Sequence, residues 1–90
     1  MEFLTKSGTY TPYEPDCESF TYLEVYRLSE DEMDNVREQA MPPAMIMERF
    51  GFENPHYFVE PGAWYTEYSF ISYNDITGLL IIEVSKALNI

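Results

Sequence analysis

Alternating apolar and polar side chains mark residues 19–28 (SFTYLEVYRL) as a strand rich in β-branched and aromatic residues. Successive side chains of a strand point to opposite faces of its sheet. One face carries Phe20, Tyr22, Glu24, Tyr26 and Leu28, and the other carries Thr21, Leu23, Val25 and Arg27. Because both faces are partly apolar, the pattern predicts a strand inside a sheet rather than at its edge.

Two helices are predicted after this strand. Ser29 and Glu32 have the spacing of a capping box, which predicts a first helix over residues 29–41. Apolar side chains recur there at helical spacing, at Met33, Val36, Ala40 and Met41. Two consecutive prolines end this helix, and a second helix is predicted over residues 43–50, because Gly51 suits a left-handed helix end.

A β-hairpin is predicted over residues 63–88, with its turn at residues 74–78 (NDITG). We expect Tyr73 to lie opposite Leu79, because this register separates most apolar side chains from polar ones. One face of the hairpin then carries Trp64, Tyr68, Phe70, Leu80, Ile82, Val84 and Leu88. The other face carries Glu67, Ser69, Glu83 and Ser85, with Ile71, Tyr73, Leu79 and Ile81 near the turn.

Residues 1–18 include Pro12 and Pro15, which remove backbone donors, and this segment is predicted to be an extended N-terminal arm. The remaining elements follow the order strand, helix, helix, strand, strand. This order predicts one small α+β domain over residues 1–90, with a mostly antiparallel sheet and both helices packed on one of its faces.

Composition narrows the classes of function. The chain has 90 residues, 46% of them hydrophobic, which indicates one folded domain. Sixteen acidic residues outnumber five basic ones, for a net charge of -11, which excludes direct binding to nucleic acid. A single cysteine, Cys17, excludes an internal disulfide and predicts a cytoplasmic location. No apolar stretch approaches the ~18 residues of a membrane-spanning helix, so no membrane association is expected.

Residues with catalytic or metal-binding chemistry are few. His56 is the only histidine, and nothing near it or Cys17 resembles a nucleophile motif with an orienting partner. Glu53 and His56 have the three-residue spacing of some metal ligands, but a proline between them breaks the helix that such a site needs. The glycines are too dispersed for a phosphate-binding loop. We therefore expect no enzymatic activity, cofactor or metal.

Acidic residues form two rows. Glu14, Asp16 and Glu18 are spaced by two, which would project all three from one side of an extended segment. Four more lie on the first helix, where Glu30, Asp34 and Glu38 form a ladder with Asp31 beside it. Two interpretations stay open: a solvated face that favours solubility, or a surface that binds a basic partner.

The leading hypothesis is a non-enzymatic binding protein that engages a basic protein through these carboxylates. By composition alone, the chain is similar to phage- or plasmid-encoded inhibitors that imitate DNA, to antitoxins and to immunity proteins. The expected partner is therefore a basic protein, for example one that binds nucleic acid. The alternative is an oligomerising domain, or one that binds a small apolar ligand between sheet and helices. That space would be lined by Tyr22, Tyr26, Trp64, Tyr68 and Phe70.

A homodimer is also expected. In the register above, Ile71, Tyr73, Leu79 and Ile81 form an apolar patch on the outer face of the hairpin. Exposed apolar patches of this kind commonly mark interfaces, and two-fold dimers are the commonest closed assembly. Within one chain, only the N-terminal arm would remain to cover the patch.

Overall fold

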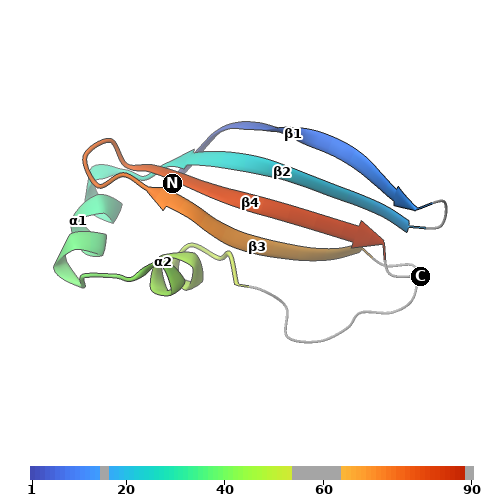
Figure 1. The fold of residues 1–90 in the computed structure, drawn as a ribbon. Helices are drawn as coiled ribbons and strands as arrows, with labels where there is room; N and C mark the ends of the chain where they lie inside the picture. Colours follow the sequence, from blue (N-terminus) through green and yellow to red (C-terminus); the bar gives the residue numbers. More distant parts are fainter. Residues whose placement is uncertain (15–16, 54–63, 89–90) are drawn as a thin grey trace.

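In the part of the chain that the structure describes, four strands and two short helices make up a small α+β fold (Figure 1). The structure is a computed structural model that describes residues 1–14, 17–53 and 64–88. In chain order the elements are β1 (Glu2–Glu14), β2 (Cys17–Arg27), α1 (Glu30–Glu38), α2 (Pro43–Arg49), β3 (Trp64–Tyr73) and β4 (Leu79–Leu88). All three strand pairs are antiparallel, and the strands lie in the order β1-β2-β4-β3.

The expected N-terminal arm is a strand of this sheet. β1 pairs with β2 from Glu2, opposite Arg27, to Glu14, opposite Cys17, so the strand predicted at 19–28 lies inside the sheet as expected. Prolines did not prevent pairing, because an edge strand uses the hydrogen-bonding groups of only one side. At Gly8 the two strands approach so closely that a Cβ atom would lie 2.4 Å from the Cα atom of Tyr22.

The predicted register of the second hairpin is correct over most of its length and wrong beside the turn. Trp64 lies opposite Leu88 and Phe70 opposite Ile82, as expected. A register shift then follows between Phe70 and Ser72, which places Tyr73 opposite Leu80 instead of Leu79. The extra residue of this irregularity, a feature that apolar patterning does not encode, moves Tyr73 to the opposite face of the sheet.

The core forms around one face of β4. Leu80 and Ile82 are 0% exposed and Val84 is 1% exposed, because alternate residues of this strand point to the same side. The same buried cluster includes side chains from both helices and the segments that flank them: Leu28, Met33, Val36, Met41, Ile46, Met47 and Phe52. Phe52, which follows α2, is 8% exposed.

The start of α1 and the end of α2 have the local structure that the sequence predicts. The Ser29 hydroxyl accepts a hydrogen bond from the Glu32 amide at 3.2 Å, and the Glu32 carboxylate accepts one from the Ser29 amide at 2.8 Å, which confirms the capping box. Gly51 has a φ of 86°, in the left-handed region expected for it. Ala40, after α1, has a positive φ of 46° as well.

The molecule is elongated, at 46 × 26 × 17 Å. Its radius of gyration is 15.0 Å, against about 12 Å for a spherical domain of this length. Figure 1 shows the reason: α1 lies near the β3–β4 turn, and the sheet extends well beyond the helices. Neither described helix has the length and apolar character needed to cross a membrane.

Candidate functional site

The carboxylates of α1 lie on the surface, as the acidic-face hypothesis requires. Glu30, Asp31, Asp34 and Glu38 are all exposed. Among the residues that the structure describes, Glu30, Asp31 and Glu38 form no ion pair. Two of these three lie in the first turn, where the helix dipole stabilises negative charge, so Glu38 is the one with no local reason to be acidic.

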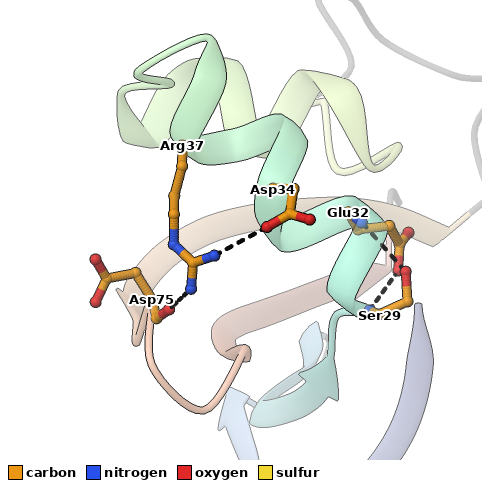
Figure 2. Close-up of polar contacts among 5 residues, drawn as sticks. All are labelled: Ser29, Glu32, Asp34, Arg37 and Asp75. Atoms are coloured by element: carbon orange, nitrogen blue, oxygen red, sulfur yellow. Dashed lines mark hydrogen bonds and ion pairs between the residues drawn. The ribbon is translucent and has the colours of Figure 1, made fainter.

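Asp34, the middle residue of the predicted ladder, is paired. Its carboxylate lies 3.1 Å from the Arg37 guanidinium, which also donates a hydrogen bond to the backbone carbonyl of Asp75 (Figure 2). An exposed ion pair of this kind contributes at most about 1 kcal/mol. The hydrogen bond from Arg37 to Asp75 connects α1 to the β3–β4 turn, and Asp34 pairs with the guanidinium that makes it, so Asp34 is not part of a row of unpaired carboxylates.

The β3–β4 turn is held by its own hydrogen bonds. The Asn74 side-chain oxygen accepts from the amides of Ile76 and Thr77, at 2.9 and 3.1 Å. The Gly78 carbonyl in turn accepts from the Leu28 amide at 2.9 Å, which joins the turn to the end of β2. Ile76, at the tip of this fixed turn, is 84% exposed.

An open groove of about 520 Å³ separates α1 from this turn. Its lining includes Glu30 and Asp34 on one side, Ile76 and Thr77 on the other, and the side chains of Arg27, Leu28, Met33 and Arg37. An exposed isoleucine and exposed carboxylates therefore border the same groove. Sequence reasoning placed the turn but overlooked Ile76, although an isoleucine among Asn, Asp, Thr and Gly was the available signal.

The second predicted acidic row is not one extended segment. Glu14 ends β1 and lies opposite Cys17 in β2, so the chain reverses direction between them. A spacing of two residues projects side chains to one side only along a continuous strand. Asp16 and the side chains of Glu14 and Glu18 lie outside the part of the chain that the structure describes.

Glu32 has a structural role at the start of α1. Besides the capping box, its carboxylate lies 2.8 Å from the amino nitrogen of Met1. Partial burial acts to raise the pKa of Glu32, but hydrogen bonds from the Met1 ammonium and from Ser29 outweigh it, and the pKa is lowered overall. The Glu32 carboxylate therefore stabilises the start of α1.

An aromatic cluster lies among the side chains expected to line a space between sheet and helices. The Phe52 ring lies 5.1 Å from that of Tyr26 and 5.4 Å from that of Tyr68, between centroids. Burial, with the neighbouring Glu24 carboxylate that accepts the hydroxyl hydrogen bond at 3.2 Å, raises the pKa of Tyr26 to about 12. Phe52 thus packs against two of the side chains predicted to line that space, Tyr26 and Tyr68. The Trp64 side chain lies outside the described part.

A groove of about 540 Å³ remains open beside α2 and β3. Its lining combines aromatic, aliphatic and acidic side chains: Ala44, Met47, Glu48, Phe52, Glu53, Tyr68 and Phe70. Glu48 and Glu53 are exposed and, within the described ranges, form no ion pair. Sequence reasoning placed Tyr68 and Phe70 here but did not anticipate the two glutamates.

The expected dimer patch is divided between two faces. Ile71 is 48% exposed, and Leu79 and Ile81 are half-buried on the outer face. Tyr73 instead packs against the core, and its buried hydroxyl has no hydrogen-bond partner among the described residues. Burial raises the pKa of Tyr73, an effect that Arg37 opposes and Asp75 reinforces.

Within the described ranges, no three His, Cys, Asp or Glu side chains are grouped as metal ligands would be. His56 and the Cys17 side chain lie outside those ranges. Comparison of the chain with protein families, curated proteins and solved structures finds no match to any of them.

Proposed function

We propose that this chain is a non-enzymatic binding protein that engages a basic protein surface through α1. The observation that carries the proposal is the exposure of Glu30, Asp31 and Glu38, without ion pairs in the described part of the chain, with Glu30 and the exposed Ile76 lining the same groove. Carboxylates at an interface steer a basic partner and set its orientation. An apolar residue among them supplies contact area that excludes water.

Rigidity supports the same proposal. The capping box fixes the start of α1, and the Arg37 side chain connects the helix to the β3–β4 turn that carries Ile76. Both parts of the surface are therefore held in place before a partner arrives. A preorganised surface loses less conformational freedom on binding, which favours affinity.

A matched pair of charge-reversal variants tests the location. The first carries Glu30→Lys and Glu38→Lys on α1, and the control carries Glu48→Lys and Glu53→Lys, with the same change in net charge. Host proteins retained by the wild-type chain and released by salt are identified, and their affinity for each variant is measured. We expect the α1 variant to bind at least about 100-fold more weakly, since like charges placed together cost several kcal/mol.

Two results would contradict the assignment to α1. Equal loss of binding by both variants would indicate that only net charge matters, and full binding by the α1 variant would place the site elsewhere. Asp34 is left unchanged in both variants because it holds Arg37. Circular dichroism and urea unfolding establish that each variant remains folded.

A nucleic-acid-binding partner is the specific form of this proposal, with the carboxylates standing in for phosphates. Duplex DNA should then compete with the chain for the same partner, and added salt should weaken both complexes. Simultaneous binding of DNA and the chain would argue for a different class of basic partner. We place this activity in the reducing cytoplasm, where one cysteine in the chain needs no pairing.

Homodimerisation is a second candidate, favoured by the half-exposed apolar side chains of the outer sheet face. After the register correction, the patch consists of Leu23, Val25, Ile71, Leu79 and Ile81. We infer that both helices pack on the other face, around Leu80. Because β1 is the edge strand of the same sheet, it does not cover this patch, and neither helix does. Light scattering at micromolar concentration should detect a dimer that Ile81→Lys abolishes, and a wild-type monomer would remove this candidate.

A further inference from the structure

The groove beside α2 combines two chemistries in one lining. Phe52, Tyr68 and Phe70 provide aromatic rings, and Glu48 and Glu53 provide carboxylates. Aromatic faces attract cations through their quadrupole, and carboxylates attract them by charge. Neutral apolar molecules use only the first part of such a lining, and small inorganic cations use only the second.

A lysine of the chain already shows this chemistry at the opposite edge of the sheet. The Lys6 ammonium lies 5.3 Å from the centre of the Tyr22 ring, on the strand face shared with Tyr68 and Phe70. At the β3 edge the aromatic rings are instead accompanied by two carboxylates. Arg49 lines the adjoining groove with both glutamates but forms no ion pair with either.

We propose that the α2–β3 groove binds an organic cation, an alkylammonium group whose carbon chain lies against the aromatic rings. Its volume of about 540 Å³ lies within the range of about 300–1,000 Å³ usual for small-molecule sites. Phe52 is 8% exposed and anchored between Tyr26 and Tyr68, so the floor of the groove is fixed. Glu48, on α2, and Glu53, just after it, supply the negative charge for the ammonium.

This site is separate from the proposed α1 surface, and the two are tested with different molecules. The first probe is choline, which carries a quaternary ammonium, and its matched control is 3,3-dimethyl-1-butanol, which has the same shape without the charge. Chemical shifts of the backbone amides are followed in ¹⁵N-labelled protein at constant ionic strength. Choline should shift the amides of Glu48, Phe52, Glu53 and Tyr68, and the neutral alcohol should bind at least about tenfold more weakly.

Variants identify the contribution of each part. Glu48→Gln with Glu53→Gln should weaken choline binding about tenfold, whereas Glu67→Gln, an exposed carboxylate on the other face of β3, should leave it unchanged. Phe70→Leu, which keeps a side chain of related size, should weaken it as well. A second probe, a peptide with one trimethyllysine, distinguishes a free amine from a protein side chain as the source of the cation.

Three outcomes would overturn the proposal. Equal binding of choline and the neutral alcohol would make the groove an apolar site without preference for charge. Unchanged binding by the double glutamine variant would remove the glutamates from it, and no shift up to 50-fold excess of either cationic probe over about 1 mM protein would show that the groove does not bind this class. None of these results bears on the effect of reversing Glu30 and Glu38.

Discussion

The two helices contribute side chains to the same buried cluster, but different local features stabilise them. α1 has a complete capping box at Ser29, an ion pair and a hydrogen bond through Arg37, and two buried residues, Met33 and Val36. α2 has no side-chain cap at Pro42 and also buries two residues, Ile46 and Met47. At 9 and 7 residues, both are too short to be stable alone.

We expect α1 to depend more on its ends and α2 more on its buried face, because only α1 has a side-chain cap and a polar contact to the β3–β4 turn. Local polar signals determine where α1 starts, and its exposed side remains free to carry carboxylates. α2 depends on contact with the aromatic cluster and β3, and its exposed carboxylates lie next to that contact. The two acidic regions therefore differ in kind: one is a polar ridge and the other borders aromatic rings.

The largest expected effect is the loss of the buried face of α2. Ile46 is 3% exposed, and Ile46→Ala should lower the free energy of unfolding by about 2–4 kcal/mol, through lost burial and the cavity left behind. The neighbouring Met45 is 41% exposed, and Met45→Ala should change stability by less than about 0.5 kcal/mol. Urea unfolding measures both, and similar values would show that α2 is not held by packing.

A smaller effect is expected at the start of α1. Ser29→Ala removes the hydroxyl that accepts from the Glu32 amide and should cost about 1 kcal/mol. If α1 depends on its ends, this loss should exceed that of Met45→Ala and fall below that of Ile46→Ala. A cost near zero in urea unfolding would show that packing alone positions α1.

The pH dependence of the same cap follows from the lowered pKa of Glu32. Its stabilising effect is fully present above the unfolded-state pKa near 4.5 and is lost as pH falls through the lower folded-state pKa. Glu32→Gln cannot titrate, so the difference in unfolding free energy between wild type and this variant should shrink below pH 4.5. Other carboxylates are common to both proteins and cancel. A difference that is constant with pH would contradict the assigned contacts.

The features that sequence predicted well are those with a local cause. The capping box needs only Ser29 and Glu32, and the left-handed end of α2 needs only Gly51. The alternation in β4 likewise identifies Leu80, Ile82 and Val84 as the buried side. Each of these depends on residues within a few positions of one another, so the pattern contains all the information required.

The features that sequence missed depend on contacts between distant segments. β1 carries few large apolar residues, and only its pairing with β2 reveals it as a strand. The extra residue between Phe70 and Ser72 moves Tyr73 across the sheet, and no spacing rule shows it. Among the site residues, the exposure of the α1 carboxylates was predictable from helical spacing, but the groove that unites Glu48, Glu53 and Phe52 with β3 was not.

The smallest expected effect, that of Ala40→Gly, concerns the C-terminal ends of the helices, which share one geometry. After α1, the Met41 amide donates to the Val36 carbonyl at 3.1 Å, and after α2, the Phe52 amide donates to the Met47 carbonyl at 2.8 Å. This arrangement places the preceding residue in the left-handed region, where a Cβ atom is unfavourable. Ala40 has that conformation after α1, and Gly51 has it after α2.

Introducing glycine at residue 40 and removing it at residue 51 should therefore change the free energy of unfolding in opposite directions. Ala40→Gly should raise the free energy of unfolding by a few tenths of a kcal/mol, because relief of the left-handed strain of alanine exceeds the added flexibility of glycine in the unfolded chain. Gly51→Ala should lower it by about 1 kcal/mol; nothing lies within 4 Å of its would-be Cβ atom, so the cost is conformational rather than steric. Thermal unfolding of the two variants, with wild type between them, gives the comparison. If Ala40→Gly is destabilising, the strain of left-handed Ala40 is smaller than the flexibility that glycine adds to the unfolded chain, and the expected difference in sign between the two helix ends is wrong.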